Sequence, residues 1–247
     1  MTFITMGKRP LWKRALARLG KQALAWRFRH FRPGMQPERW VRVAGMRLRV
    51  ASGVFDPGIH FTSAFLAQYL GRPGVISPTD HVLDVGTGSG IAAIAAARAG
   101  ASHVVAVDVN PHAVLCAKDN IARMGLRGRV EVRESDMFAA APGEQFDLIV
   151  CNPPYFRGVP TNFAERAYMA GANYEWLDRF SQEARGHLHA GGRCLMVIGD
   201  AADVREIVRR LGRAGWNVAV GAKRDIVVEV IYIFILQFAE SNDMQSY

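Results

Sequence analysis

The sequence Asn152-Pro153-Pro154-Tyr155 carries the groups needed to hold a flat NH₂ group. It directly follows the apolar run 146–151, which predicts a buried strand, and open α/β sheets bind ligands beyond the carboxyl ends of their strands. The two prolines fix the backbone and lack N–H donors. The side-chain oxygen of Asn152 and the carbonyl of Pro153 can then both accept hydrogen bonds from one NH₂ group, and Tyr155 offers it an aromatic face. In isolation, such a sequence could equally be a rigid turn.

A second informative stretch is the glycine series Gly86, Gly88 and Gly90, which lies between a predicted strand at 82–85 and a predicted helix. Glycines let the backbone turn sharply and approach a ligand closely. The N–H groups at the start of the following helix attract electron-rich groups. The G-x-G-x-G spacing differs from the G-x-G-x-x-G of dinucleotide-binding folds. The spacing disfavours a dinucleotide, but a glycine turn alone does not name another ligand.

Three acidic residues lie at or near the ends of successive predicted strands. Asp108, 22 residues after Gly86, could accept hydrogen bonds from both hydroxyls of a ribose. Asp136 could take an adenine amino group while Met137 packs against the ring, and Asp84 could face the cationic amino group of a methionine moiety. Each aspartate alone could cap a turn or a helix. Together, beside the glycine series, they predict a site for S-adenosylmethionine.

These two sites together predict methyl transfer to nitrogen. Orienting an NH₂ group toward a sulfonium methyl group is worth several kcal/mol, with about 7–11 kcal/mol as the upper range. The oxygens that hold the NH₂ group also stabilise the positive charge that develops on nitrogen. No general base is needed before transfer, because the product cation is acidic. His60, in the segment 54–63, is interpreted as structural, with a role as proton acceptor as the alternative.

The elements that must position these residues alternate between strands and helices. We predict main-sheet strands at 82–85, 104–107, 129–133, 146–151, 193–198, 216–220 and 226–238. We predict helices at 90–99, 111–124, 174–188 and 202–214, and turns at 188–193 and 223–225. This alternation is typical of an α/β fold with a doubly wound, mostly parallel seven-stranded sheet. The short connection before the last strand makes that strand antiparallel.

The N-terminal part of the chain differs in composition from the rest. Residues 1–37 contain nine Lys and Arg and no acidic residue, which equals the net charge of +9, so the remainder is neutral. The spacing of Trp12, Leu16, Leu19, Ala23 and Trp26 predicts a short basic helical extension. A strand pair at 40–43 and 46–50 follows it. We therefore divide the chain into an arm with a strand pair, residues 1–50, and a catalytic domain, residues 51–247.

The arm has three alternative interpretations. Its apolar stripe could dock on the body, its basic residues 8–32 could contact RNA, or it could lie on a membrane surface or act in organelle targeting. The longest apolar run, 226–238, has 13 residues and includes Glu229, whereas a membrane span needs about 20. The cysteines Cys116, Cys151 and Cys194 lie too far apart for a metal motif, and we interpret them as reduced thiols of a cytoplasmic protein.

The motifs resemble those of the class I S-adenosylmethionine-dependent methyltransferases with an Asn-Pro-Pro-Tyr motif, which have a Rossmann-like fold. Within these, the chain is most similar to the release-factor glutamine N-methyltransferase family. The similarity runs from about Val54 to Gly199 and includes the turn 188–193. It implies that Thr62 lines the cofactor pocket and that Asn152 also contacts the cofactor. It also implies that Asn152 and the Pro153 carbonyl hold the target amide while Tyr155 stacks on it.

The resemblance implies an S-adenosylmethionine-dependent N-methyltransferase whose acceptor is a glutamine side chain of a protein. The chain departs from that family in two places. A basic stretch of only about 50 residues stands where the family has a larger helical N-terminal domain, and the segment 167–174 is less similar. Two other acceptors therefore stay open, namely the exocyclic amine of adenine or guanine in RNA and a small molecule. A cofactor-binding protein without catalysis is a fourth alternative, which the intact Asn152–Tyr155 motif disfavours.

Overall fold

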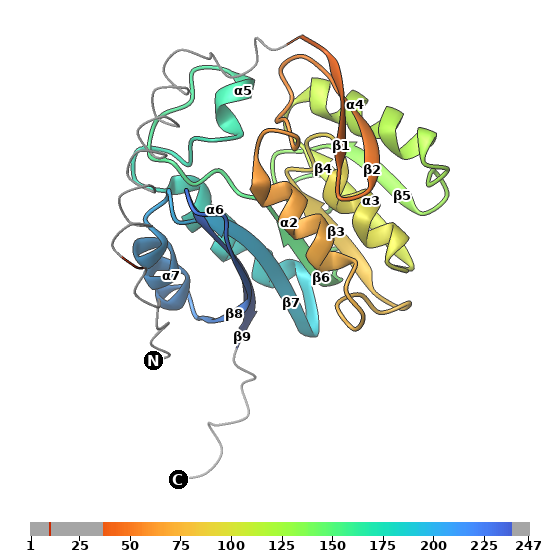
Figure 1. Cartoon of the computed structure of the whole chain (residues 1–247). Coiled ribbons are helices and arrows are strands. Elements are labelled where there is room, and N and C mark those ends of the chain that lie inside the picture. The colour runs from red at the N-terminus through yellow and green to blue at the C-terminus, as the bar shows by residue number, and fades with distance from the viewer. Residues whose placement is uncertain (1–9, 11–36, 239–247) are drawn as a thin grey trace.

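The computed structural model describes Pro10 and residues 37–238 of the chain. The strands of the main sheet are β3 (His81–Val85), β4 (His103–Asp108), β5 (Val130–Glu134), β6 (Phe146–Cys151), β7 (Leu188–Gly199), β8 (Trp216–Asp225) and β9 (Val230–Phe238). They lie in the order β5-β4-β3-β6-β7-β9-β8 (Figure 1). Strands β3 to β7 are parallel, and β9 runs antiparallel to both β7 and β8. This confirms the predicted seven-stranded, mostly parallel sheet with an antiparallel last strand.

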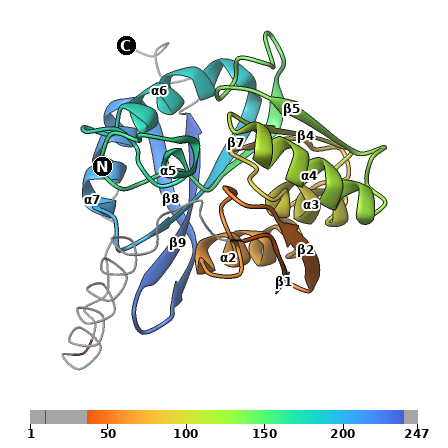
Figure 2. The ribbon, with the colours of Figure 1, turned by 90° about the horizontal axis from the view of Figure 1, so that it is seen from above.

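Helices cover both faces of this sheet (Figure 2). The helices are α2 (Phe61–Leu70), α3 (Ile91–Arg98) and α4 (Pro111–Arg123) on one face, and α6 (Glu175–Glu183) and α7 (Val204–Arg213) on the other. Side chains of the central strand β6 alternate between the two layers, with Leu148 and Val150 in one core and Ile149 and Cys151 in the other. Because both faces are buried, this strand reads as a nearly continuous apolar run.

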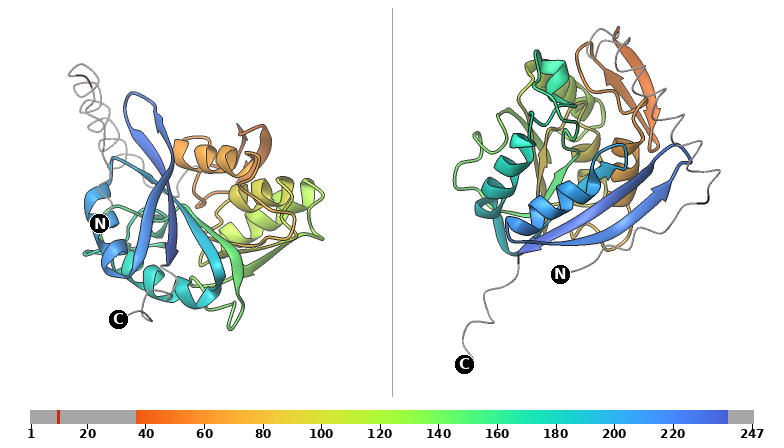
Figure 3. Two further views of the ribbon diagram at one scale, coloured as in Figure 1. Left: turned by 90° about the horizontal axis from the view of Figure 1, so that it is seen from below. Right: turned by 90° about the vertical axis from the view of Figure 1, so that its left-hand side faces the viewer.

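The predicted strand pair is present as a hairpin of β1 (Arg39–Val43) and β2 (Met46–Val50), which lies outside the main sheet (Figure 3, orange). Ala44 and Gly45 both have positive φ, 49° and 74°, as the two-residue turn of a hairpin requires. Alternate residues of the hairpin join the core formed by α2, α3 and α4. The proposed boundary at residue 50 stays a prediction. The basic arm lies outside the described residues, apart from Pro10 and Pro37.

The predicted helix at 174–188 is too long. Helix α6 ends at Glu183, a 3₁₀ turn spans Ala184–His187, and Leu188 already pairs with Phe146 as the first residue of β7. The ring of His187 hydrogen-bonds through Nδ1 to the carbonyl of Glu144 at 2.9 Å. This bond holds the chain before β7 against the chain before β6. The predicted turn at 188–193 lies within β7, where the pairing is irregular: Leu188 pairs with Phe146 and Arg193 already with Leu148, so the chain bulges between them, with a φ of 75° at Gly191.

The last strand begins at Val230 and not at residue 226. The predicted turn at 223–225 is part of β8, because Asp225 pairs with Val230 and the guanidinium of Arg224 lies 4.5 Å above the ring of Phe65. The chain turns at 226–229, where Val227 has a φ of 72°. Within the described residues, we find no helix with the length and apolar character that crossing a membrane requires.

Candidate active site

A cleft lies at the carboxyl ends of β3, β4 and β6, where the strand order reverses between β3 and β6. This reversal is where open α/β sheets bind their ligands. The cleft encloses about 1010 Å³, including open solvent at its mouth. The predicted site residues that line it are Asp84, Gly86, Gly88, Asp108, Asp136, Met137, Asn152 and Pro154. The cleft thus brings the predicted cofactor residues next to the Asn-Pro-Pro-Tyr motif.

The glycine turn connects β3 to α3. All three glycines have positive φ, with 76° at Gly86, 56° at Gly88 and 85° at Gly90. Gly90 does not line the cleft but packs on α4, where an added Cβ would lie 3.3 Å from both Cα and Cβ of Ala117. Glycine at this position therefore meets two demands, a left-handed backbone and a close approach between two elements.

Asp84, the fourth residue of β3, is buried beneath this turn. Its Oδ2 accepts hydrogen bonds from the Thr87 hydroxyl at 2.7 Å and from the Ala93 N–H at 3.0 Å. Burial raises the pKa of Asp84 to about 6, although these two hydrogen bonds act in the opposite direction. A cationic ligand in the cleft would lower that pKa again, because an opposite charge favours the ionised form.

Asp108 ends β4 and supports the same turn. Its Oδ2 accepts a hydrogen bond from the Gly88 N–H at 2.8 Å, and its Oδ1 accepts one from the Asn110 N–H at 2.9 Å. Burial raises the pKa of Asp108, against these hydrogen bonds. No described basic side chain forms an ion pair with Asp84 or Asp108. The two desolvated carboxyl groups make this end of the cleft suited to a ligand that brings a cation and hydroxyl donors.

Asp136 and Met137 follow β5 at the mouth of the cleft. The carboxylate of Asp136 is 56% exposed and forms an ion pair with Arg179 at 2.9 Å. Met137 is buried, with a φ of 53°, and its carbonyl accepts a hydrogen bond from the Ser135 hydroxyl at 2.9 Å. The left-handed backbone turns the Met137 side chain into the cleft wall, whereas Asp136 stays near solvent.

Asn152 directly follows β6, and its orientation is fixed from behind. Its Nδ2 donates to the hydroxyl of Ser63 at 3.0 Å and to that of Thr62 at 3.3 Å, both of them buried in the first turn of α2. Its Oδ1 accepts no hydrogen bond from a described residue. Since both amide hydrogens have partners, the oxygen is the free hydrogen-bonding group that Asn152 presents to the cleft.

The rest of the motif, apart from Pro154, does not line the cleft. Pro153 and Pro154 are buried, and of these two only Pro154 lines the cleft. Burial, followed by the charge of Glu229, raises the pKa of Tyr155, while a hydrogen bond with Thr62 lowers it. The Tyr155 ring is therefore held in the layer that supports Asn152, and it meets Phe156 edge to face with 4.9 Å between the ring centroids.

His60 directly precedes α2, its side chain makes no hydrogen bond to the helix N-terminus, and it does not line the cleft. Its ring stacks on Phe55 at 4.5 Å, and its Nε2 lies 3.2 Å from the Tyr168 hydroxyl. Phe55 lines the cleft, so His60 supports the cleft wall.

Comparison with known proteins identifies the family. The profile of the methyltransferase small domain matches residues 45–224, which is most of the chain. A Methanocaldococcus jannaschii protein with the provisional name protein N5-glutamine methyltransferase is 30% identical over 201 residues, covering 78% of this chain and 96% of that one. The chain belongs to the methyltransferase small domain family. It is an S-adenosylmethionine-dependent methyltransferase of class I.

Two further matches are a curated relative and a solved structure that shares the fold. The release factor glutamine methyltransferase of Cereibacter sphaeroides is 36% identical over 187 residues, which are 69% of this chain and 63% of that one. This methyltransferase therefore spans less than two thirds of that relative. A 16S rRNA methyltransferase from T. thermophilus, solved with AdoMet and guanosine, shares the fold with a TM-score of 0.58 and 22% identity. That match covers 82% of this chain and 50% of that one.

Several cleft residues of the methyltransferase were not predicted from the sequence. They are Phe55, Ser63, Thr87, Asn110, Ser135, Phe163, Arg166 and Trp176. Phe55 and Ser63 lie close to Thr62, which the family resemblance placed at the cofactor pocket, so this part of the sequence held a usable signal. Phe163 and Arg166 come from the short helix α5 (Phe163–Arg166), in a stretch with no local motif.

Proposed function

We propose that this methyltransferase transfers a methyl group to the side-chain amide nitrogen of a glutamine in a protein. The proposal rests on the fixed orientation of Asn152, which offers an oxygen to an NH₂ group at the edge of the cofactor cleft. It is also supported by relatives named as glutamine methyltransferases, among them the Bordetella pertussis enzyme of ribosomal protein uL3, 36% identical over 181 residues.

We propose the following cofactor contacts. Asp84 would face the amino group of the methionine moiety, and Asp108 would accept the ribose hydroxyls. Met137 would pack on the adenine, with Asp136 near its amino group. The glycine turn, Gly86 to Gly90, would allow the close approach of the backbone. The buried carboxyl group of Asp84 and the partly buried one of Asp108, without described cationic partners, fit a ligand that carries an ammonium group and hydroxyls. The family resemblance placed Thr62 at the cofactor, but we propose that Thr62 instead supports Asn152.

The cofactor supplies an electrophilic methyl group on a sulfonium. Asn152 Oδ1 and the Pro153 carbonyl would accept the two N–H bonds of the glutamine amide and aim its nitrogen at the methyl carbon. The new N–C bond forms as the S–C bond breaks, and the sulfur keeps the electron pair. The two acceptor oxygens stabilise the charge that develops on nitrogen, which then loses a proton to solvent.

The RNA-base alternative rests on basic residues 8–32, which lie outside the described residues. We also propose that the protein works in the cytoplasm, as a reducing compartment. The support is that the three cysteines, Cys116, Cys151 and Cys194, are free and buried.

The test is to incubate the full-length chain and methyl-labelled S-adenosylmethionine with separated protein, RNA and small-molecule fractions of a cell extract. We expect label in the protein fraction, and tandem mass spectrometry should locate it on a glutamine side chain. Label in RNA or in a small molecule instead would refute the glutamine assignment.

Asn152→Ala tests the assigned role within the same assay. The variant should bind the cofactor like the natural protein in calorimetry, because the proposed cofactor contacts lie elsewhere in the cleft. Its transfer rate should fall at least about 100-fold, the loss measured when one preorganised stabilising group is removed from an active site. A variant that transfers methyl groups at the natural rate would show that Asn152 does not hold the acceptor.

A further inference from the structure

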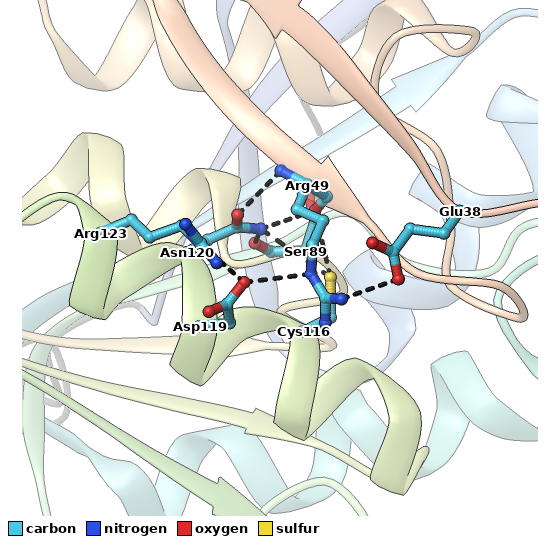
Figure 4. A network of polar contacts seen from close by, with 7 residues as sticks. All are labelled: Glu38, Arg49, Ser89, Cys116, Asp119, Asn120 and Arg123. Atoms are coloured by element: carbon cyan, nitrogen blue, oxygen red, sulfur yellow. Dashed lines mark hydrogen bonds and ion pairs between the residues drawn. The ribbon is translucent and has the colours of Figure 1, made fainter.

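Asn120, on α4, is a buried polar side chain that joins the β1–β2 hairpin to the glycine turn (Figure 4). Its Oδ1 accepts the Arg49 N–H at 2.8 Å. Its Nδ2 donates to two backbone carbonyls, those of Arg49 at 2.8 Å and of Ser89 at 2.9 Å. Asn120 is 1% exposed, so water does not readily replace it in these hydrogen bonds. The methyl-transfer chemistry described above makes no use of Asn120.

The Ser89 carbonyl is the part of this contact that bears on the cofactor. Ser89 lies between Gly88 and Gly90, whose left-handed backbones form the turn. Glycine at both sides leaves the backbone of the turn with many alternative conformations unless other groups fix it. Asp108 fixes the Gly88 N–H, and Asn120 fixes the carbonyl one residue later. The turn is therefore held by side chains from two separate elements, β4 and α4.

We infer that Asn120 is a positioning residue for S-adenosylmethionine, because it holds the Ser89–Gly90 peptide in the orientation that the cofactor meets. It does not line the cleft, so it acts through the turn and not by contact. Asn120 bonds to the backbone N–H and carbonyl of Arg49 in β2. The hairpin backbone therefore holds Asn120 in place from the side away from the cleft. This inference rests on the cofactor alone and holds whichever acceptor is methylated.

The same region contains a second set of contacts that serves as an internal comparison. Arg49 forms ion pairs with Glu38 at 2.7 Å and with Asp119 at 3.0 Å, and Asp119 also pairs with Arg123 at 2.9 Å. These side chains are between 26% and 54% exposed. Ion pairs near solvent contribute little. Asp119 attaches the hairpin to α4 without touching the glycine turn, which makes Asp119→Asn a matched control for changes at Asn120.

The experiment measures the affinity of the full-length chain for S-adenosylmethionine and S-adenosylhomocysteine by calorimetry. Asn120→Ala leaves the Ser89 carbonyl without its partner, and we expect both dissociation constants to rise about 5- to 30-fold, as loss of a buried hydrogen bond predicts. Asp119→Asn should change them by less than about twofold. The rate of transfer at saturating cofactor should fall by less than about threefold in both variants, because Asn120 does not touch the reacting groups.

Thermal unfolding and hydrogen exchange complete the experiment. Thermal unfolding shows whether each variant is folded, and Asn120→Ser replaces Asn120→Ala if the latter does not fold. Hydrogen exchange of the amides at 87–91, without ligand, should be faster in the Asn120 variant than in Asp119→Asn. A folded Asn120 variant with natural cofactor affinity would overturn the inference. So would an equal loss of affinity in Asp119→Asn, because the effect would then come from hairpin attachment in general.

Discussion

The two hydroxyls behind Asn152 allow a sharp test of how the acceptor is oriented. In the double variant Thr62→Val, Ser63→Ala, both hydrogen-bond partners of Asn152 Nδ2 are lost, 3.3 Å and 3.0 Å away in the natural protein. The amide can then rotate so that Nδ2 faces the acceptor NH₂ group, where donor would meet donor. Two neutral hydrogen bonds favour the natural orientation by about 1–2 kcal/mol. We therefore expect kcat/KM for the acceptor to fall about 5- to 30-fold.

The cofactor provides the control for this test. Thr62 does not line the cleft, whereas Ser63 does, so the control is the single variant Thr62→Val, whose affinity for S-adenosylhomocysteine should stay within about twofold of the natural value in calorimetry. Thr62→Ser, which keeps a hydroxyl, should retain most of the activity. The assay is transfer of labelled methyl groups to the protein fraction that accepts them. Unchanged acceptor kinetics in the double variant would refute the orienting role. A large loss of cofactor affinity in Thr62→Val alone would show that Thr62 does contribute to the cofactor site.

Two further predictions concern the cofactor end of the cleft. The pKa of Asp84 is raised to about 6, so the carboxyl group is ionised above that pH and protonated below it. Because a cationic ligand favours the ionised form, affinity for S-adenosylmethionine should fall as the pH drops from 7.5 to 5, by up to about tenfold per pH unit below 6. Asp84→Asn should bind more weakly at pH 7.5 and show a flatter profile in calorimetry. For Gly90→Ala, the left-handed backbone and the approach to Ala117 at 3.3 Å should lower the free energy of unfolding by about 2 kcal/mol, measured by denaturant titration. Natural stability in that variant would show that α4 moves away easily.

The parts of the structure that local patterns determine could be predicted from the sequence. Strand β6 is buried on both faces and therefore gives a continuous apolar run, and the glycine turn follows from residues that tolerate positive φ. Helix α2 was not predicted, because seven of its ten residues are buried and no polar face remains to reveal a helical period. The charged residues at 223–225 suggested a turn, but pairing of Asp225 with Val230 keeps them in β8.

The candidate site shows the same division. Asp84, Asp108 and Asn152 could be found because each lies at or near the end of a strand with its own local signal. The contact between Asn152 and Ser63 joins residues 89 positions apart, and that between Asn120 and Arg49 joins residues 71 positions apart. Such pairs arise only once the sheet has brought α2, α4 and the hairpin together. No spacing rule within the sequence identifies them.

The two ends of the cleft are held in different ways, and this bears on how relatives with one cofactor serve several acceptors. The glycine turn is held by Asp108 from β4 and by Asn120 from α4, so the cofactor end is fixed by separate core elements. Another part of the cleft wall comes from the segment 156–171, which folds back on itself through hydrogen bonds from the Phe156 N–H to the Tyr168 carbonyl at 2.9 Å and from the Ala170 N–H to the Phe156 carbonyl at 2.8 Å. This segment brings Phe163 and Arg166 to the cleft but belongs to no strand of the sheet. Phe163 and Arg166 lie outside the sheet that fixes the glycine turn, and we therefore expect acceptor choice to depend on these two residues.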